Sequence, residues 1–338
     1  MTAIQPPTVI PSRAEWRSVV AAYEGPSTWR SVLQLLTTLL PLSGMFYLMY
    51  RSLVLPYWVT LLLSLPTAGF LVRTFVLMHD CSHGSFFRWR QMNEIVGFFT
   101  GVLTLTPFAR WRRDHAMHHA SSGDLDRRGH GDVPTLTVRE YLARSPGGRF
   151  AYRAYRHPLT LILLGPIHVV MSQRLPRKTA PNHTVEGRSV WLTNLAAATL
   201  FVAFSLWVGF GTVSIIFFPT MYFAASAGVW LFYVQHQFED TYWKDHADWD
   251  YVTAAIRGSS FFKLPYPLQW MTGSIGLHHV HHLSPRIPNY KLQRAHDENP
   301  MFHDVTVLTL VQSAKTLRLS LWDEDRQELV AFKDLKNR

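Results

Sequence analysis

The sequence of 338 residues contains a single cysteine, Cys81, so it cannot form an internal disulfide and gives no sign of an oxidising compartment. Its first thirty residues hold charged side chains and no apolar core, so we expect no cleavable signal peptide. The chain also lacks an internal repeat, a low-complexity tract and a glycine-rich nucleotide fingerprint. These absences argue against a secreted disulfide scaffold and against a nucleotide-binding domain.

Charged residues are almost missing from four long apolar runs. A helix needs about 20 mostly apolar residues to cross a hydrocarbon core of about 30 Å. The runs that meet this length form two pairs joined by short turns near Arg51 and Gly211, and they span 31–50, 53–72, 190–210 and 212–234. The sequence therefore predicts an all-α integral membrane protein with four transmembrane helices in two hairpins and a helical cap, rather than a large soluble protein with buried helices.

Two shorter apolar runs, 95–108 and 159–171, have about the length that is typical of interfacial, re-entrant or buried segments. Acidic residues are outnumbered, with 23 Asp and Glu against 33 Lys and Arg and a net charge of +10. Fourteen of the basic residues lie in 110–188, whereas the two tight turns contain only Arg51. Because positive charge stays on the cytosolic side, we expect cytosolic termini and cap, a basic surface lying on lipid, and no nucleic-acid partner.

Three histidine boxes follow apolar runs on this one predicted side of the membrane. They read "HDCSH" at 79–83, "HAMHH" at 115–119 and "HHVHH" at 278–282, and "VQHQFE" adds His236 at the end of the fourth run. On a helix, residues three or four positions apart lie on one side, so each box should aim its imidazoles at one point. The candidate metal ligands are His79, His83, His115, His118, His119, His236, His278, His281 and His282.

Eight or nine imidazoles exceed what one metal ion needs. A structural zinc ion takes four ligands and a catalytic zinc ion takes three plus water, whereas two metal ions with four or five ligands each would use the whole set. Imidazole suits zinc, copper, iron and nickel, so ligand type alone does not identify the metal. We favour a redox-active pair. Cys81 points away from His79 on a helix and is expected to be a small buried residue, and His279 is expected to pack beside the ligands or support them.

The boxes, their spacing, the intervening spans and the "LSPRIPNYKL" stretch resemble the membrane fatty acid desaturases, especially the acyl-lipid branch that acts at the delta-12 or omega-3 side. The resemblance covers residues 30–295, leaving 1–29 as an N-terminal cytosolic segment and 296–338 as a C-terminal cytosolic tail. It implies a non-haem di-iron centre, with two Fe ions held by the nine histidines and O2 as co-substrate. One departure is Phe232, which stands where the animal stearoyl-type branch has an asparagine.

The resemblance also implies the reaction and its partners. Desaturation removes hydrogen from unactivated carbons, which no side-chain base can do, so a metal centre must supply the oxidant. The expected substrate is a fatty acyl lipid or an acyl thioester, and the product carries a cis double bond. Because no cytochrome b5-type segment is present, electrons should come from an external carrier, ferredoxin or cytochrome b5. The excess of arginine over lysine favours a bacterial inner membrane over the endoplasmic reticulum.

Carboxylates near the boxes are candidates to orient the imidazoles by accepting their second N–H. Asp80, Asp114, Glu239 and Asp240 lie close to ligands in the sequence, and we expect Asp114 or Glu239 to take this role. Aromatic residues such as Trp111, Phe261, Phe262 and Trp270 are candidates to line a dry acyl channel or to pack in the core.

Other functions remain open at this point. The nearest alternative is a hydroxylase or ketolase that uses the same metal centre on a lipid or carotenoid. A membrane zinc hydrolase would use "HDCSH" with Asp80 as base, but it would leave six histidines without a role. A non-catalytic metal carrier predicts charged groups inside the spans, where Arg73 is the closest case.

Overall fold

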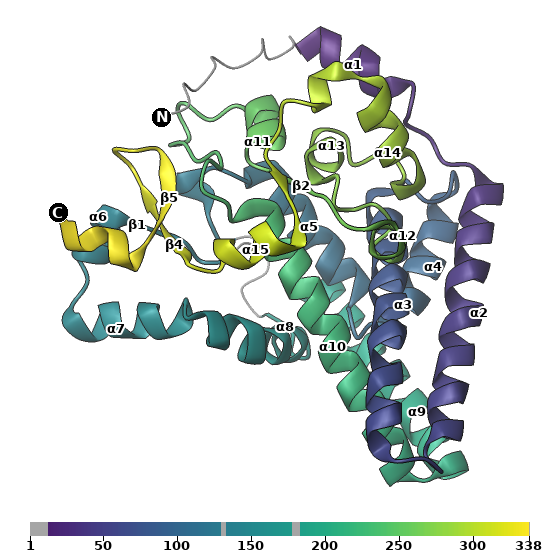
Figure 1. Cartoon of the computed structure of the whole chain (residues 1–338). Helices are drawn as coiled ribbons and strands as arrows, with labels where there is room; N and C mark the ends of the chain where they lie inside the picture. Colours follow the sequence, from purple (N-terminus) through teal and green to yellow (C-terminus); the bar gives the residue numbers. More distant parts are fainter. Residues whose placement is uncertain (1–12, 130–132, 178–182, 338) are drawn as a thin grey trace.

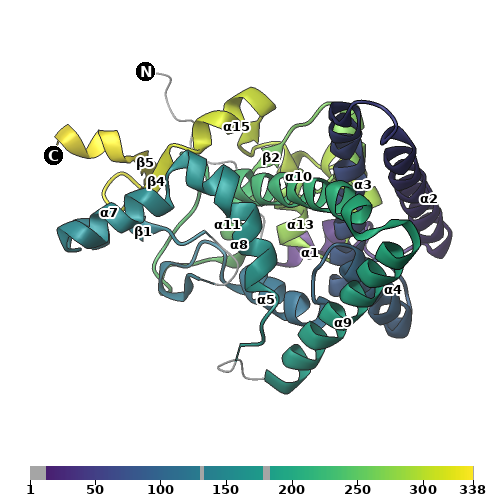
Figure 2. The same ribbon diagram turned by 90° about the horizontal axis from the view of Figure 1, so that it is seen from below.

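The computed structural model describes residues 13–129, 133–177 and 183–337 of the chain. Four helices are long and apolar enough to cross a membrane, and they lie side by side as the stalk of the molecule (Figures 1 and 2). They are α2 (Thr28–Ser52), α3 (Tyr57–His83), α9 (His183–Val208) and α10 (Phe210–His236). The remaining elements gather at one end of the stalk and form what we call the cap. This arrangement confirms the predicted helical architecture with four long apolar helices.

The two hairpin turns lie at the far end of the stalk from the cap. Residues 53–56 form the first turn, so α3 begins at Tyr57 and not at 53 as the sequence predicted. The second turn is at Gly209, whose φ of 95° falls in the left-handed region that glycine adopts without steric cost. The prediction of a turn at Gly211 was therefore wrong by two residues, because Gly211 lies inside α10.

The length of hydrocarbon that a helix must cross defines a plane at which the apolar part of the stalk ends and the cap begins. A stretch of about 20 helical residues covers the hydrocarbon core, since each residue rises about 1.5 Å. Counting from the turn ends of the four helices, this length is reached at Val32, Leu77, Arg188 and Trp230. The histidines of α3 and α10 lie beyond this plane, on the cap side. The chain thus continues two membrane-length helices directly into the cap.

The cap contains short helices packed around a core of buried side chains from distant segments. Val20 of α1, Val76 of α3 and Leu277 belong to the same buried cluster, which also includes Leu292 and Phe302. The α-helices of the cap are α1 (Arg13–Ala21), α4 (Arg90–Leu103), α5 (Phe108–Ser121), α6 (Val138–Leu142), α7 (Pro146–Tyr155), α8 (Gly165–Ser172), α11 (Tyr251–Arg257), α12 (Tyr266–Met271), α13 (His278–Leu283), α14 (Asn289–Glu298) and α15 (Leu310–Thr316).

Short strands join parts of the cap that are far apart in sequence. In one sheet β4 pairs in parallel with β1 and antiparallel with β5, and in the other β2 pairs in parallel with β3. The strands are β1 (Leu136–Thr137), β2 (Phe261–Phe262), β3 (Val307–Leu308), β4 (Leu319–Asp323) and β5 (Glu328–Ala331). Leu321 and Trp322 of β4 are buried, so the C-terminal segment is packed into the cap.

The two shorter apolar runs have different positions. Residues 95–108 belong mainly to α4, which packs against α3 and α9. Residues 159–171 form a π-helical turn, η2 (Thr160–Leu164), followed by α8, and both pack against α10. Helices α7 and α8 run across the stalk direction at the lower edge of the cap (Figure 1).

Strand β2 holds the backbone before the third histidine box very closely. The Phe262 N–H donates to the Gly276 carbonyl at 2.8 Å, and a Cβ added to Gly276 would lie 2.3 Å from the Phe262 carbonyl oxygen. Because the obstacle is backbone, a side chain at this position must displace the segment that leads into α13.

We therefore expect Gly276→Ala to lower the free energy of unfolding by about 1–3 kcal/mol, as overpacking of a tight site does. Thermal unfolding of the purified protein in detergent measures this change. Gly44→Ala is the matched control, because a Cβ there meets no atom within 4 Å. Equal melting temperatures for the two variants would contradict the close approach of β2 to Gly276.

Candidate metal centre

Nine histidines from four helices meet just beyond the plane where the stalk enters the cap. Their ligand nitrogens form two groups, and within each group all of them lie within 4.8 Å of one another. Group 1 consists of His79, His83, His115, His119 and His281. Group 2 consists of His118, His236, His278 and His282. The groups adjoin, because the rings of His119 and His282 stack with centroids 4.1 Å apart.

The local structure explains how each helix presents its histidines. Helix α3 runs to His83 and ends at Gly84, whose φ of 68° provides the left-handed C-cap. Helix α10 ends at His236, and α13 is a single short helix that consists almost wholly of the third box. All the box histidines therefore lie on helices, as their spacing predicted.

The two HxxHH boxes are divided between the groups, and this differs from the expectation that each box aims at one point. His115 and His119 belong to group 1, whereas His118 belongs to group 2. In the third box His278 and His282 belong to group 2 and His281 to group 1. The reason is helical geometry: adjacent residues differ by about 100° around the axis, so positions i+3 and i+4 diverge. Each of the two HxxHH boxes thus contributes histidines to both groups and links them.

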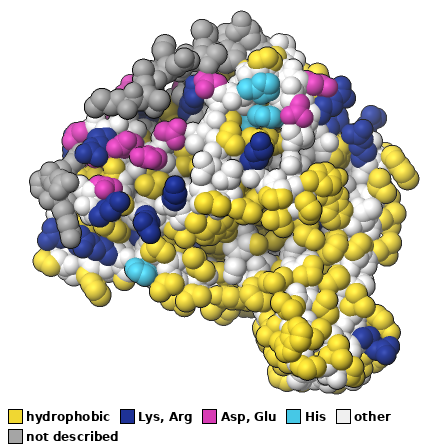
Figure 3. Space-filling view, viewed as in Figure 1, with side chains coloured by type: hydrophobic (Ala, Val, Ile, Leu, Met, Phe, Trp, Pro, Cys, Tyr) yellow, Lys and Arg dark blue, Asp and Glu magenta, His cyan; other side chains and the backbone are white. Residues whose placement is uncertain are grey.

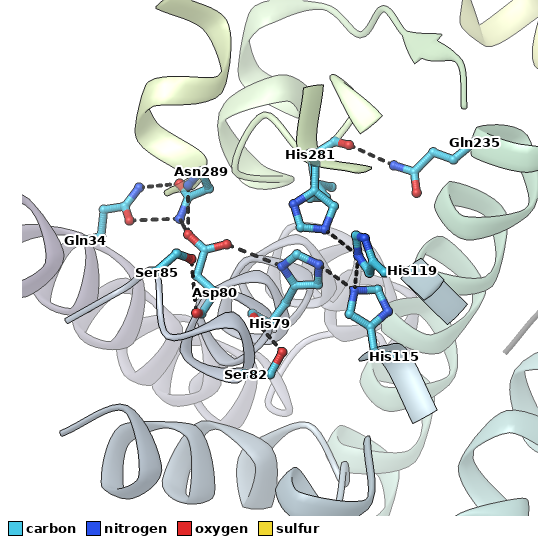
Figure 4. A network of polar contacts seen from close by, with 11 residues as sticks. Gln34, His79, Asp80, Ser82, Ser85, His115, His119, Gln235, His281 and Asn289 are labelled. Carbon is cyan, nitrogen blue, oxygen red and sulfur yellow. Dashed lines mark hydrogen bonds and ion pairs between the residues drawn. The ribbon is translucent and has the colours of Figure 1, made fainter. Parts of the chain in front are cut away.

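The imidazole nitrogens of each group converge closely. In group 1 the Nε2 atoms of His79 and His115 are 3.0 Å apart, and those of His119 and His281 are also 3.0 Å apart (Figure 4). In group 2 the Nε2 of His236 lies 3.1 Å from that of His118 and 3.0 Å from that of His278. Lone pairs pointed at one another in this way are what a shared cation would stabilise.

Contacts on the outer ring nitrogens fix which nitrogen points inward. The Nδ1 of His236 lies 3.0 Å from the Gly258 carbonyl oxygen, which can only accept, so this nitrogen carries the proton and Nε2 is left bare. The Nδ1 of His79 lies 3.3 Å from a carboxylate oxygen of Asp80. Such partners orient the ligands of a metal site and set their tautomers.

Burial keeps these imidazoles neutral, which is the form that binds metal. Loss of solvation lowers the pKa of His115, His119 and His281 well below the ordinary 6.5, and neighbouring histidines lower it further. The same two causes, burial first, lower the pKa of His278 and His282. These five histidines therefore offer neutral imidazoles to the two groups.

Several buried imidazole nitrogens of the two groups have no hydrogen-bond partner among the residues that the structure describes. They include Nε2 of His83 and Nδ1 of His119 in group 1, and Nε2 of His282 and Nδ1 of His278 in group 2. A buried polar atom without a hydrogen bond is costly, so an ion at each group would remove a cost that the protein otherwise bears. The residues thus fit a pair of metal ions with five and four imidazole ligands.

Asp80 holds a central place in the polar network next to group 1 (Figure 4). Its second oxygen accepts from both the backbone N–H and the side-chain amide of Asn289, each at 2.8 Å. The Asn289 side-chain oxygen in turn accepts from Gln34 of α2 at 2.7 Å. The sequence reasoning missed Asn289 and Gln34, although Asn289 lies in the stretch that follows the third box. The network connects α2, α3 and α14 to the imidazole of His79.

The other carboxylates suggested by sequence lie elsewhere. Asp114 pairs with Arg177 and lies 3.8 Å from Arg110, so it is engaged by cations instead of an imidazole. The side chain of Glu239 is exposed, and Asp240 is also exposed and accepts from Thr306. Sequence proximity misled here, because the helix directs Asp114 away from the face that carries His115 and His119.

His279 lies outside both groups. Its Nε2 is 3.2 Å from Nδ1 of His296, and burial lowers its pKa to about 3. Among the aromatic candidates, Trp111 stacks on His115 with ring centroids 4.3 Å apart. Phe261 packs against His296, while Trp270 lies over Arg73 of α3.

Phe232 forms part of the wall of group 2. Its ring centroid lies 5.0 Å from that of His118 and 5.4 Å from that of His236. An apolar ring thus lies where the resemblance would place an amide, and Trp111 covers group 1 in a similar way. Both aromatic rings pack directly against imidazoles of the site.

Comparison with known proteins adds independent evidence. Residues 52–306 match the model of the family described as fatty acid desaturase. A fatty acid desaturase of Bacillus subtilis is 45% identical over 331 residues, covering 98% of this chain and 94% of that protein. The sn-1 oleoyl-lipid 12-desaturase of Synechocystis is 26% identical and covers 72% and 68%, and the sn-1 acyl-lipid omega-3 desaturase (ferredoxin) of Synechocystis is 28% identical and covers 65% and 62%.

These matches confirm the resemblance inferred from the three boxes. They give no support to the hydroxylase, ketolase or zinc hydrolase alternatives. The family match covers α3, α5, α10 and α13, and therefore every helix that contributes to the two histidine groups. The chain is thus an enzyme of lipid metabolism and belongs to the fatty acid desaturase family.

Proposed function

We propose that this desaturase binds two Fe ions, one in each histidine group, and uses O2 to introduce a cis double bond into the acyl chain of a membrane lipid. The observation that carries the proposal is the convergence of nine imidazoles into two adjoining groups where the long apolar helices enter the cap. The two groups of five and four nitrogens provide for two ions.

The iron pair, when bound, would supply the oxidising chemistry that removes hydrogen from unactivated carbons. The overall reaction takes two hydrogens from the chain, two electrons and two protons, and it reduces one O2 to two water molecules. The contribution of this chain is to hold nitrogen ligands in place and to exclude water. Asp80 and the Gly258 carbonyl orient His79 and His236, and the rings of Trp111 and Phe232 cover the two groups.

The position of the groups supports a lipid substrate. His79 lies two residues beyond Leu77, where α3 leaves the hydrocarbon layer by length, so group 1 is close to the membrane boundary. An acyl chain anchored by its headgroup at this boundary would therefore lie close to the site. The names of two relatives, an oleoyl-lipid desaturase and an acyl-lipid desaturase, agree with this substrate class.

We place the cap in the cytosol of a bacterial cell, at the inner membrane. The support is the distribution of charge, because the segment 110–188 is rich in arginine and the far turns contain only Arg51. The electrons then come from a cytosolic one-electron carrier, ferredoxin or cytochrome b5. Ferredoxin is favoured, because the name of one relative from Synechocystis includes it.

Expression in a host that makes no polyunsaturated lipids tests the function. We expect a new unsaturated fatty acid in the extracted lipids, detected by mass spectrometry, because the nine-histidine site is complete. His118→Ala should abolish the product, since it removes a nitrogen from group 2. A product that retains oxygen, such as a hydroxy acid, would contradict desaturation.

Metal analysis of the purified protein tests the two-ion site. After anaerobic loading with Fe(II) we expect about two iron atoms per chain, because the donor set divides into two groups. His83→Ala and His278→Ala each remove one ligand from a different group and should each lower the iron content by about half. His168→Ala is the matched control, since this exposed histidine lies outside both groups. One metal atom in the fully loaded parent protein would contradict the proposal.

Asp80→Asn tests the orientation of His79. Loss of the carboxylate removes the acceptor on Nδ1, so we expect iron affinity to fall about 10–100-fold. The measurement is iron release to a chelator, with the melting temperature of the metal-free protein recorded in parallel to separate affinity from stability. Asp114→Asn serves as control, because Asp114 faces arginines. If Asp114→Asn weakens iron binding as much as Asp80→Asn, the assignment of Asp80 is wrong.

A further inference from the structure

A basic and apolar arm projects from the stalk at the lower edge of the cap. It comprises α7, η2 and α8, residues 146–172, and both views show it running across the direction of the long helices (Figures 1 and 2). Helix α8 packs against α10, while most of the arm extends to one side of the stalk. Neither the metal centre nor the proposed chemistry accounts for this element.

The arm exposes an unusual number of large apolar side chains. Six of them are between 50% and 75% exposed, namely Phe150, Leu159, Leu163, Leu164, Ile167 and Met171. Figure 3 shows hydrophobic side chains along the lower edge of the cap, and this surface continues into the apolar surface of the stalk. A contiguous exposed apolar surface of this kind marks an interaction site.

The charges of the arm all have one sign. No aspartate or glutamate occurs in residues 141–185, whereas the same stretch contains six arginines and one lysine. Arg144, Arg149 and Arg153 flank the apolar part on the side of α7, and Arg174 and Arg177 follow α8. Arg177 pairs with Asp114 and Arg174 binds Asn194, so the charge left for a partner is that of the three arginines near α7. Exposed apolar side chains next to such positive charge match an anionic lipid surface.

The level at which the arm meets α10 agrees with the membrane boundary. The Cβ position of Gly165 lies 3.6 Å from Val229, and Leu161 packs with Trp230 and Tyr233. Counting from Phe210, Trp230 is the residue at which α10 has covered about 30 Å. The arm therefore leaves the stalk where hydrocarbon gives way to headgroups, and it runs along that plane.

Hydrogen bonds fix the arm to the cap at its other face. Arg156, which is buried, donates to the Gln237 side-chain oxygen at 2.9 Å and to the Leu319 carbonyl at 2.8 Å. The Tyr152 hydroxyl donates to the Ser320 carbonyl at 2.7 Å. These buried bonds leave the opposite, apolar face turned away from the protein, so its orientation is set by the fold.

We propose that the arm is an interfacial anchor, with its apolar face inserted among the acyl chains of the leaflet next to the cap and with Arg149 and Arg153 at anionic headgroups. The occupant of this face is lipid and not a second copy of the chain, because the face is continuous with the apolar stalk and lies beside the positive charge of Arg149 and Arg153. Two identical arms in contact would bring like charges together.

Depth-dependent fluorescence quenching tests the anchor with the full-length protein in vesicles of phosphatidylethanolamine and phosphatidylglycerol. Leu163→Cys and Ile167→Cys carry an environment-sensitive label, and the parent protein, whose Cys81 is buried, gives the background. Leu195→Cys on the lipid-facing side of α9 and Lys333→Cys on the cap are the matched controls, since both side chains are exposed.

Lipids with a nitroxide near the headgroup end of the acyl chain should quench labels at positions 163 and 167 more than lipids with a nitroxide near the chain terminus. The label at position 195 should show the reverse order, and the label at position 333 should lose no fluorescence with either lipid. If the labels at 163 and 167 behave like the label at 333, the arm lies in water and the proposal fails. Disulfide-linked dimers of the unlabelled Leu163→Cys variant, without quenching of its labelled form, would show that a second copy covers the face, which also overturns it.

Discussion

The structure depends on two helices that are longer than the thickness of a hydrocarbon layer. Helices α3 and α10 each have 27 residues, or about 40 Å at 1.5 Å per residue, whereas about 30 Å suffices to cross the layer. The extra turns carry His79, His83 and His236 out of the apolar zone without a flexible joint. The candidate metal site is therefore held at a fixed height beyond the apolar length of the stalk, and α5 and α13 bring the remaining histidines to it.

This constraint explains why the cap contains polar groups whose role is to hold other side chains in place. Bringing imidazoles together in a buried site is unfavourable unless their nitrogens find partners, and the outer nitrogens of His79 and His236 use Asp80 and the Gly258 carbonyl for this purpose. Asn289 and Gln34 then hold Asp80. Even the buried cation within the stalk follows this rule, since Arg73 donates to Thr38 at 3.0 Å and to the Trp270 carbonyl, while its guanidinium lies over the Trp270 ring.

The helical content, the hairpin pairing and the histidine boxes could be predicted because each depends on local pattern. Length and apolarity identify a spanning helix, and spacing of three and four identifies residues on neighbouring parts of a helix. The sequence predicted the turn at Gly209 and the start of α3 at Tyr57 at the wrong residues. The reason is that apolar side chains continue through both turns, so hydropathy does not show where the helical backbone ends. Asp114 was expected to orient an imidazole but lies against arginines, because closeness in the sequence does not give the direction of a side chain.

By itself the sequence determined that this chain forms long apolar helices and that nine histidines lie at their ends in ligand-like spacing. Tertiary structure alone decided how those histidines are divided into groups of five and four, which carboxylate and carbonyl lie against His79 and His236, and which apolar helices form the stalk and which run across it. The reason is that helical periodicity is a property of neighbouring residues. The meeting of α3, α5, α10 and α13, by contrast, depends on packing between segments up to two hundred residues apart.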